Sequence, residues 1–387
     1  MDFTIPEEHK QIQALMRRFV RNELMPLETQ VEEKGEFPPE IRRPLIKRAT
    51  ELGLRNLSVP EKFGGGGLGL LGQAVVEEEV GWTSPGVSWG VVQGWGWSPP
   101  ASFCRVATPE QMEKYFYPVL RGEAEECGGF TEPNAGSDAA NIQTTAVKRG
   151  DSYVINGTKH FITNADRSSF AVITALTDPV KRARGGITHF IVEFGTPGFS
   201  LGAYQPMMGR RGTRNYELVL QDCVVPEKNI LGDMGGGARR TFAHFAQGRL
   251  LLGALFCGTA ERALEMAKSY AKRRATFGQP LASRQAVQWM LVDMAVDIHA
   301  TRMMTHEAAW EGDQGQDIRV KAAMVKLYSA QMVCRAVDNA IQVHGGIGYS
   351  RLLPLERMYR DARLFRIGDG TDEIMKMVIA RDLLQTE

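Results

Sequence analysis

The sequence predicts an α+β protein in which a helical part, a strand-rich part and a second helical part follow one another along 387 residues. Apolar residues recur at helical spacing before about residue 126 and again after about residue 235. Between them, short apolar runs are separated by Gly and Pro, which is typical of strands and turns. The length suggests two or three domains, and the change of pattern places them at residues 1–126, 127–232 and 233–387.

Three helices are expected in the N-terminal part. The apolar face of the first consists of Ile12, Leu15, Met16, Phe19 and Val20. The second follows Pro38-Pro39 and repeats this spacing with Ile41, Leu45, Ile46, Ala49 and Leu52. A third is expected over residues 68–80, with residues 77–79, all glutamate, on its solvated side. The Trp-rich segment at residues 82–101 either forms a helix that lines a pocket or fills the core with aromatic rings.

Strands are expected in the middle part. Residues 153–162 predict a β-hairpin around Asn156-Gly157, because that dipeptide favours tight hairpin turns. Three further strands are expected at residues 170–174, 189–193 and 216–220. The Gly and Pro residues between these runs favour a small antiparallel barrel or sandwich.

Long helices are expected in the C-terminal part. One runs from about residue 239 to 274, and a second has an apolar face of Val287, Met290, Leu291, Met294 and Ile298. A third ends at Gly345-Gly346 and carries Val320, Met324, Leu327, Cys334, Val337 and Ile341. Long helices of similar length at the end of a chain indicate an antiparallel bundle.

Composition argues against several kinds of partner. The chain has 46 Lys+Arg against 45 Asp+Glu, so neither nucleic acid nor an anionic membrane is expected to bind. The longest apolar run, residues 250–257, is too short to cross a bilayer. Five scattered cysteines without a Cys-x-x-Cys pair indicate reduced thiols and argue against a metal site. The N-terminus lacks a secretion signal, so we expect a cytoplasmic protein.

The most informative stretch is the turn at residues 366–374, where Gly368 and Gly370 flank Asp369. Thr371 can serve as the N-cap of the helix that follows. A helix N-terminus offers free backbone N–H groups and the positive end of a dipole, which suits a phosphate. A carboxylate beside it indicates proton abstraction next to a large phosphorylated cofactor. The alternative interpretation is an ordinary glycine-bounded helix start with a solvated aspartate.

Four other stretches each have a functional and a plain structural interpretation. Small residues and hydroxyls at residues 130–138 permit close approach of a ligand, but they are also typical of turns. Phe161 and Thr163 face one side of a strand, where they either back a flat ring or are simply half-buried. The basic residues at 272–274 either bind a phosphate or complement a helix dipole. Gly345-Gly346 caps a helix, with or without a ligand.

Taken in order, five blocks resemble the acyl-CoA dehydrogenase family of flavoproteins over essentially the whole chain. They are Phe130-Thr131-Glu132-Pro133-x-Ala135-Gly136-Ser137-Asp138, Asn156-Gly157-x-Lys159-x-Phe161-Ile162-Thr163-Asn164, Arg274-x-x-Phe277-Gly278, Gln342-x-x-Gly345-Gly346 and Gly370-Thr371-x-Glu373-Ile374. The resemblance implies an N-terminal helical domain, a middle antiparallel β-domain and a C-terminal four-helix bundle. It also implies a homotetramer, with FAD between the β-domain and the bundle and in contact with a neighbouring subunit.

Carried over residue by residue, the resemblance implies sites for cofactor and substrate. The isoalloxazine would be lined by Phe130, Thr131, Ser137, Phe161 and Thr163, and Ser137 would also lie near the CoA diphosphate. The FAD of the adjoining subunit would contact Arg274, Phe277, Gln285, Gln342 and Gly346. Thr371 and Glu373 would hold a pyrophosphate, and the acyl-CoA would lie against Phe245, Arg249 and Gly370.

The resemblance further implies α,β-dehydrogenation of an acyl-CoA thioester to the 2-enoyl-CoA. Asp369 would remove the α-proton while the β-hydrogen passes to flavin N5 as a hydride, and electron-transfer flavoprotein would take the electrons. Because the acyl chain and the flavin exclude water, the carboxyl group is expected to be less acidic than in water.

The chain departs from the family at the base. The family usually has glutamate where this chain has Asp369, and the base position of some branches is Gly248 here, which cannot act. Aspartate is shorter by ~1.5 Å. Gly368, where the family often has tyrosine, widens the space beside the thioester, so we expect a bulky, branched, cyclic or otherwise unusual acyl group.

Two alternatives follow from this departure. The first is an oxidase on the same fold, such as a nitroalkane oxidase, since these use an aspartate base and need no CoA. The second is a catalytically silent flavin- or CoA-binding assembly protein. Before the turn, a basic band consists of Arg351, Arg357, Arg360, Arg363 and Arg366. Acidic residues are interleaved with it, so we expect subunit or domain ion pairs there rather than a dock for an electron carrier.

Overall fold

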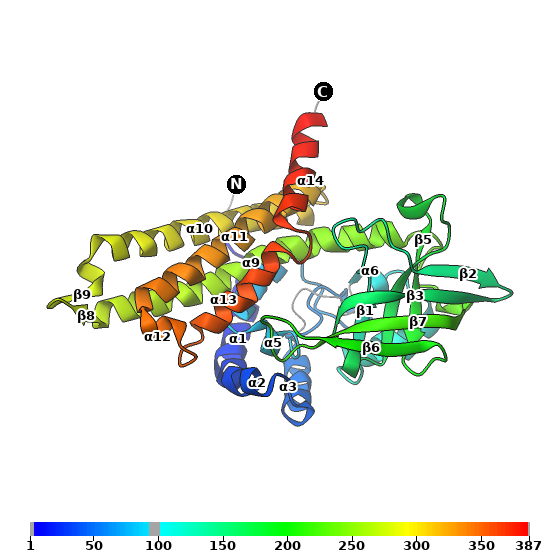
Figure 1. The fold of residues 1–387 in the computed structure, drawn as a ribbon, viewed down its shortest axis with the longest axis horizontal. Coiled ribbons are helices and arrows are strands. Elements are labelled where there is room, and N and C mark those ends of the chain that lie inside the picture. The colour runs from blue at the N-terminus through cyan, green and yellow to red at the C-terminus, as the bar shows by residue number, and fades with distance from the viewer. Residues whose placement is uncertain (1–3, 93–100, 386–387) are drawn as a thin grey trace.

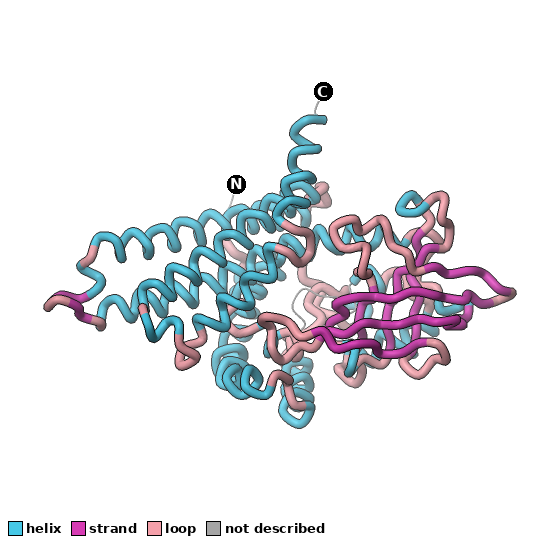
Figure 2. The backbone as a smooth tube through the Cα atoms, in the orientation of Figure 1, coloured by secondary structure: helices cyan, strands magenta, loops and turns pink. Residues whose placement is uncertain are grey.

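The computed structural model describes residues 4–92 and 101–385 and has the predicted α+β architecture. A β-sheet lies at one end, long C-terminal helices extend to the other, and the first helices lie below their junction (Figure 1, Figure 2). The N-terminal helices are α1 Glu7–Phe19, α2 Glu28–Lys34, α3 Pro39–Glu51, α4 Leu70–Val80, α5 Pro85–Ser88, α6 Ala101–Cys104, α7 Pro109–Gln111 and α8 Tyr117–Leu120.

The first two predicted apolar faces are buried in α1 and α3. Met16 and Phe19 of α1 are buried, as are Ile46 and Ala49 of α3. Pro39 stands at the first position of α3, where the missing N–H costs nothing because that donor has no partner within a helix. The sequence pattern therefore predicted both the helices and the sides that they bury.

The prediction that residues 77–79 form a solvated face was wrong. Glu77 and Glu79 are only 8% and 3% exposed. Glu79 accepts hydrogen bonds of 2.9 and 2.6 Å from Arg17 of α1. Glu78 accepts hydrogen bonds from Arg302 of α10, the helix at Gln285–Asp313. Carboxylates can lie inside where guanidinium groups pair with them, and here these pairs tie α4 to helices on two sides.

Seven strands of the middle part form one hydrogen-bonded sheet in the order β1-β4-β2-β3-β7-β6, with β5 paired to β4. The strands are β1 Glu126–Gly129, β2 Thr145–Arg149, β3 Ser152–Thr163, β4 Phe170–Leu176, β5 Ile187–Glu193, β6 Phe199–Gln205 and β7 Asn215–Pro226. The pairings are mostly antiparallel, although β4 runs parallel to β1 and β2. The three short strands predicted from the sequence are β4, β5 and β7.

The predicted hairpin around Asn156-Gly157 was wrong, because both residues lie inside the single long strand β3. The hairpin turn comes earlier, where Arg149 of β2 pairs with Ser152 of β3. Gly157 instead lies at an irregularity in the β3–β7 pairing. An added Cβ there would lie 2.3 Å from the hydroxyl of Thr144, so the glycine serves a close approach within the sheet.

The C-terminal part is the predicted helical bundle. Its helices are α9 Gly237–Arg273, α10 Gln285–Asp313, α11 Arg319–His344, α12 Gly346–Tyr349, α13 Leu355–Arg363 and α14 Asp372–Gln385. The short strands β8 Ala275–Thr276 and β9 Gln279–Pro280 form a hairpin between α9 and α10. Helix α9 packs against both α10 and α11, and α13 packs against α11.

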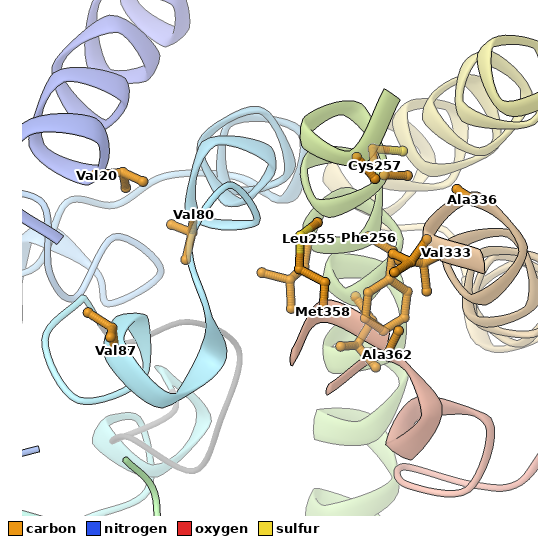
Figure 3. Close-up of a cluster of buried hydrophobic side chains, with 14 of the residues drawn as sticks. Val20, Val80, Val87, Leu255, Phe256, Cys257, Val333, Ala336, Met358 and Ala362 are labelled. Carbon is orange, nitrogen blue, oxygen red and sulfur yellow. The ribbon is translucent and has the colours of Figure 1, made fainter. Parts of the chain in front are cut away.

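The main core joins the N-terminal part to the bundle. Figure 3 shows valines of the N-terminal part facing side chains of α9, α11 and α13, including Val20, Val80, Val87, Leu255, Phe256, Val333, Ala336, Met358 and Ala362. Small side chains of α9 and α11 are fully buried, which lets these helices approach closely; they include Ala260, Ala263, Ala267, Ala330 and Ala340. This core therefore holds α9, α11 and α13 against the N-terminal part.

A buried cluster of ion pairs links α2 to the C-terminal helices. Glu28 accepts hydrogen bonds of 2.7 and 2.9 Å from Arg262 and one of 2.7 Å from Arg357. One turn further on, Glu32 pairs with Arg360 at 2.7 Å. Two members of the basic band therefore form domain ion pairs, as predicted, and face inward rather than toward a partner.

Residues 93–100 lie outside the described part of the chain, and so does much of the segment for which a pocket-lining helix was predicted. Trp82 and Trp89 from the same segment pack against the main core. The five cysteines are free thiols. Among the described residues, none of the helices combines the length and apolar character that a bilayer crossing requires.

Candidate active site

The turn that carries Asp369 has an unusual backbone. Asp369 and Gly370 both adopt the left-handed conformation, with φ of +58° and +98°. The φ at position 370 favours glycine, and an added Cβ there would force a shift of Met375 Cε at 2.6 Å and Arg249 Nη2 at 3.0 Å. A residue other than glycine persists in this conformation only where its surroundings impose it, which marks Asp369 as a constrained position.

Two cations hold this turn. Arg249 of α9 donates from Nε to the Asp369 carbonyl at 2.8 Å, and Lys326 of α11 donates from Nζ to the Gly370 carbonyl. Lys326 is fully buried, and burial lowers its pKa to about 8. Two long helices thereby fix the backbone that bears the carboxyl group.

Lys326 was not among the predicted site residues. Its sequence signal is weak, because it is one lysine placed on the same helix face as Ala322, Ser329 and Val333, which are buried. A charged residue on a buried face needs a partner, and that requirement is the signal that could have identified it.

The Asp369 carboxyl group is half-buried, and burial raises its pKa to about 6. The charges of Lys326, Arg210 and Arg249 oppose this rise. The group is therefore less acidic than in water, as expected from the sequence. It remains largely ionised at neutral pH and is a stronger base than an exposed aspartate.

Thr371 caps α14 as predicted, since its Oγ1 accepts a hydrogen bond from the Ile374 N–H at 3.2 Å. Asp372 is buried and pairs with Arg366 at 2.8 Å, while Glu373 is exposed. The start of α14 therefore lies beside Asp369 with its dipole and backbone N–H groups, the arrangement that suits a phosphate.

Helix α9 connects this turn to the β-domain. The Phe245 ring lies 5.7 Å from the Arg249 guanidinium carbon and 5.4 Å from the Phe130 ring, which it meets edge-on. The structure therefore brings Phe130, Phe245, Arg249, Asp369 and Gly370 together in one region between the sheet and the bundle.

The loop after β1 is fastened by a buried ion pair. Glu132 and Lys159 lie 2.6 Å apart, with side chains 3% and 0% exposed, and Glu132 also accepts a hydrogen bond from the Gln143 N–H. This pair explains why both residues occur in the sequence blocks, since together they hold the loop against β3. The side chain of Thr131 is half-buried and that of Ser137 exposed at the edge of this loop.

A partly exposed aromatic ring stands near the end of the interior strand β3. Phe161 has φ +58°, its N–H donates to Gln205 at 2.7 Å, and its side chain is 51% exposed. Thr163 donates a hydrogen bond of 2.7 Å to Asn215. The N–H of His160 donates to the carbonyl of Thr131 at 2.8 Å, which brings the loop after β1 next to Phe161. A constrained, half-exposed aromatic ring beside this loop fits a flat heterocycle, so the residues present fit a flavin.

The residues predicted to contact a neighbouring subunit's FAD lie at the far end of the bundle, around β8 and α12 (Figure 1). All five are exposed: Arg274, Phe277, Gln285, Gln342 and Gly346. Tyr270 and His344 stack 4.4 Å apart and join the ends of α9 and α11 there. About 38 Å of helix, at 1.5 Å per residue, separates this end from Arg249. These five residues are thus remote from Asp369 of the same chain.

A constrained carboxylate, a phosphate-ready helix start and an exposed aromatic ring together suit a flavin-dependent oxidoreductase. Comparison with known proteins identifies the family. Three family models match the chain: "Acyl-CoA dehydrogenase, N-terminal domain" at residues 6–123, "middle domain" at 127–223 and "C-terminal domain" at 235–384. The chain belongs to the acyl-CoA dehydrogenase family, whose members use FAD to oxidise a CH–CH bond.

Individual relatives agree with this assignment. The chain is 40% identical to "probable acyl-CoA dehydrogenase YngJ" of Bacillus subtilis (strain 168) over 387 residues, which is 100% of both chains. It matches the structure of butyryl-CoA dehydrogenase from Megasphaera elsdenii with a TM-score of 0.91, 35% identity and 100% of both chains covered. It also matches a chain in the structure described as electron transferring flavoprotein of Acidaminococcus fermentans, with a TM-score of 0.92, 34% identity and 100% of both chains covered. The predictions of family, fold and FAD are confirmed.

Proposed function

We propose that this enzyme oxidises an acyl-CoA thioester to the 2-enoyl-CoA and that Asp369 is its base. One observation carries the proposal: Asp369 is a carboxylate with a pKa raised to about 6 by burial, on a turn held by Arg249 and Lys326. Such a base is ionised at neutral pH and yet more basic than a solvated aspartate.

In the proposed reaction the acyl-CoA lies against Phe245, Arg249 and Gly370, with its α-carbon facing Asp369. The carboxylate takes the α-proton, and the positioned base contributes about 10²–10⁴-fold to the rate. When bound, FAD supplies the two-electron acceptor, to whose N5 the β-hydrogen passes as a hydride. The chain's own task is to align the thioester and exclude water around Asp369.

The proposed cofactor contacts are those of the sequence blocks. The isoalloxazine would be held by Phe130, Thr131, Ser137, Phe161 and Thr163, and Ser137 would also meet the CoA diphosphate. A pyrophosphate would lie at Thr371 and Glu373, where the start of α14 offers N–H groups. The half-exposed ring of Phe161 supports this placement.

The space beside Gly368 supports an unusual acyl group. An added Cβ at Gly368 would meet only Leu364, at ordinary distances of 3.7–3.8 Å, so space is open where a larger side chain could stand. Together with the shorter base, this space suits an acyl group that is bulky, branched or cyclic near the thioester.

We further propose a cytoplasmic homotetramer of three domains, at residues 1–126, 127–232 and 233–387, that passes its electrons to an electron-transfer flavoprotein. Phe277 supports the assembly, since a ring that is 97% exposed at the end of the bundle suits contact with a neighbouring subunit. The free cysteines support a reducing compartment. The similarity to a chain in a structure of an electron transferring flavoprotein supports the electron acceptor.

The test is anaerobic bleaching of the bound flavin by two classes of substrate. A panel of straight, branched, cyclic and aromatic acyl-CoAs should reduce the flavin, and primary nitroalkanes should not. Reduction by nitroalkanes, followed by rapid reoxidation in air, would instead establish the oxidase that an aspartate base allows. A flavin that stays oxidised with every compound of both classes would point to the silent assembly protein.

A further inference from the structure

Arg210 is a buried arginine near the base that the reaction described above does not use. It lies in the loop between β6 and β7, has φ +58° and is only 9% exposed. Its guanidinium carbon lies 3.9 Å from the centre of the Trp89 ring, and its backbone N–H donates to a carboxylate oxygen of Asp361. The Trp89 ring in turn meets Phe365, four residues before Asp369. The side chain is therefore held in place without the use of its own N–H groups.

The guanidinium of Arg210 has no hydrogen-bonding partner among the described residues. Its Nε and Nη2 atoms are buried and unpaired, and no carboxylate lies within ion-pair distance. The other deeply buried arginines each meet a carboxylate or a backbone carbonyl; they are Arg42, Arg55, Arg240, Arg262 and Arg357. Buried donors are normally satisfied, so an unpaired guanidinium edge indicates a missing partner.

The two unpaired atoms are on the edge of the guanidinium that binds a carboxylate. Elsewhere in this chain, Arg17 uses the same pair of atoms to hold Glu79, with Nε at 2.9 Å and Nη2 at 2.6 Å from the two carboxylate oxygens. Two parallel N–H groups on a planar fork match the spacing of a carboxylate, whereas a neutral acyl chain would leave both donors unmet.

The location of Arg210 connects it to the reacting end of the site. Its charge and that of Asp369 are close enough to shift one another's pKa. The other two cations beside Asp369 are already engaged, since Arg249 and Lys326 donate to the carbonyls of the turn. Arg210 is therefore the cation near Asp369 whose Nε and Nη2 donors are left without a partner among the described residues.

We propose that Arg210 determines substrate specificity by binding a carboxylate carried by the acyl group, away from the thioester. This inference rests on the proposed acyl-CoA dehydrogenation and adds the class of substrate, namely acyl-CoAs with a second, free carboxyl group. Nε and Nη2 of Arg210 donate to the carboxylate, the Trp89 ring packs against the guanidinium, and Asp369 is left to take the α-proton.

The experiment compares acyl-CoAs of equal chain length that end in either a methyl group or a carboxylate, across four to seven carbons. Rates of anaerobic flavin reduction are measured for the wild type, Arg210→Met and Arg210→Lys. The wild type should prefer the carboxylate series. Arg210→Met should lower the ratio of kcat/KM for carboxylate over methyl substrates by ~100-fold, because two charge-assisted hydrogen bonds are lost. Arg210→Lys should lower it less, since the charge remains while the fork is lost.

A neighbouring arginine provides a matched control. Arg211 is in the same loop, its side chain is 48% exposed, and it lies 3.8 Å from Glu32. Arg211→Met should leave the substrate ratio unchanged. Equal loss on both substrate series in Arg210→Met, or loss of bound FAD in both Arg210 variants, would show a structural or cofactor role and overturn the inference.

The two levels of the proposal fail in different ways. If methyl-ended acyl-CoAs bleach the wild-type flavin and carboxylate-ended ones do so no faster, acyl-CoA dehydrogenation stands and the role of Arg210 is wrong. If neither these two series nor the branched, cyclic and aromatic acyl-CoAs of the wider panel bleach the flavin, the proposed function itself is wrong, and with it the assignment of Arg210.

Discussion

The two ends of the long C-terminal helices differ in how far the candidate site residues there are held by other residues of the same chain. At the inner end, the carbonyls of Asp369 and Gly370 are both bonded by side chains from α9 and α11, and Lys326 is fully buried. At the outer end, the side chain of Phe277 is 97% exposed in the turn between β8 and β9. One end is built from a single chain, and the other offers its side chains outward.

This difference indicates which of the proposed tasks a single subunit can perform without a neighbouring subunit. Proton abstraction needs a rigid base, and the inner end has every contact that rigidity requires. The outer end has the aromatic, basic and amide side chains of the proposed cofactor contacts, and all of these residues are exposed. We therefore expect changes at the inner end to alter the chemistry and changes at the outer end to alter assembly and cofactor retention.

The largest effect is expected when the carboxylate is removed from the inner end. Asp369→Asn should lower the rate of flavin reduction by an acyl-CoA by about 10²–10⁴-fold, because the base is lost while the size of the side chain is kept. Stopped-flow absorbance of the flavin measures this rate. Asp369→Glu should retain measurable activity, since it keeps a carboxylate. Near-full activity of Asp369→Asn with normal FAD content would refute the assignment of the base.

A smaller effect is expected from loosening the turn. Lys326→Met should lower kcat by ~10–100-fold, because the carbonyl of Gly370 loses its donor and the base loses its alignment. The charge of Lys326 also lowers the pKa of Asp369, so the acid limb of the kcat/KM profile should move to higher pH. Lys321→Met is the control on the same helix, since Lys321 pairs with Glu307 and Glu311 at the surface. An unmoved acid limb in Lys326→Met would contradict this role.

The wild-type pH profile should report the inner end directly. Burial raises the pKa of Asp369 to about 6, and the base acts only when ionised. The value of kcat/KM should therefore increase as pH rises through about 6, level off above it, and fall by ~10-fold for each pH unit below. Steady-state assays with an artificial electron acceptor measure the profile. An acid limb near 4, the value for solvated carboxylates, would mean that the base is exposed.

The smallest effect on a single chain is expected at the outer end. Phe277→Ala should change the stability of the isolated chain by less than ~0.5 kcal/mol, because the ring has almost no contacts of its own. It should nevertheless weaken the tetramer and the retention of FAD, as measured by light scattering and flavin absorbance. Val180→Ala is the control, since Val180 is 90% exposed on the β-domain. Unaltered assembly and flavin content in Phe277→Ala would break the comparison between the two ends.

The sequence pattern predicted the elements better than their surroundings. Apolar periodicity found α1, α3, α9, α10 and α11, because burial of one face leaves a regular trace in the sequence. It failed at Glu79, because the sequence does not distinguish a buried glutamate from a solvated one. Glu79 is buried because it pairs with Arg17, which is distant in the chain. It failed at Gly157 too, because a glycine required by a close approach within a sheet looks like a turn glycine.

The candidate site shows the same division. The turn at residues 366–374 and the family resemblance pointed to Asp369, Arg249 and Phe245, which the fold brings together. Lys326 and Arg210 were missed, because neither is part of a motif and each acquires its meaning from segments far away in the chain. Lys326 meets a carbonyl 44 positions further on, and Arg210 is held by Asp361, 151 positions away. Roles that depend on such distant pairs require the three-dimensional structure.

The ion pairs of α2 have a consequence for how this protein is made. Glu28 is bonded to Arg357, and 329 positions of chain separate them. Its other partner, Arg262, is itself 234 positions away. A ribosome must therefore synthesise the chain at least as far as Arg262 before either guanidinium can neutralise this carboxylate. Until then the first helices cannot close around an unpaired charge, so they wait in an open state that invites aggregation. A nascent chain halted before residue 262 should bind a holding chaperone and be cut readily by protease near α2, whereas the released full-length chain should resist.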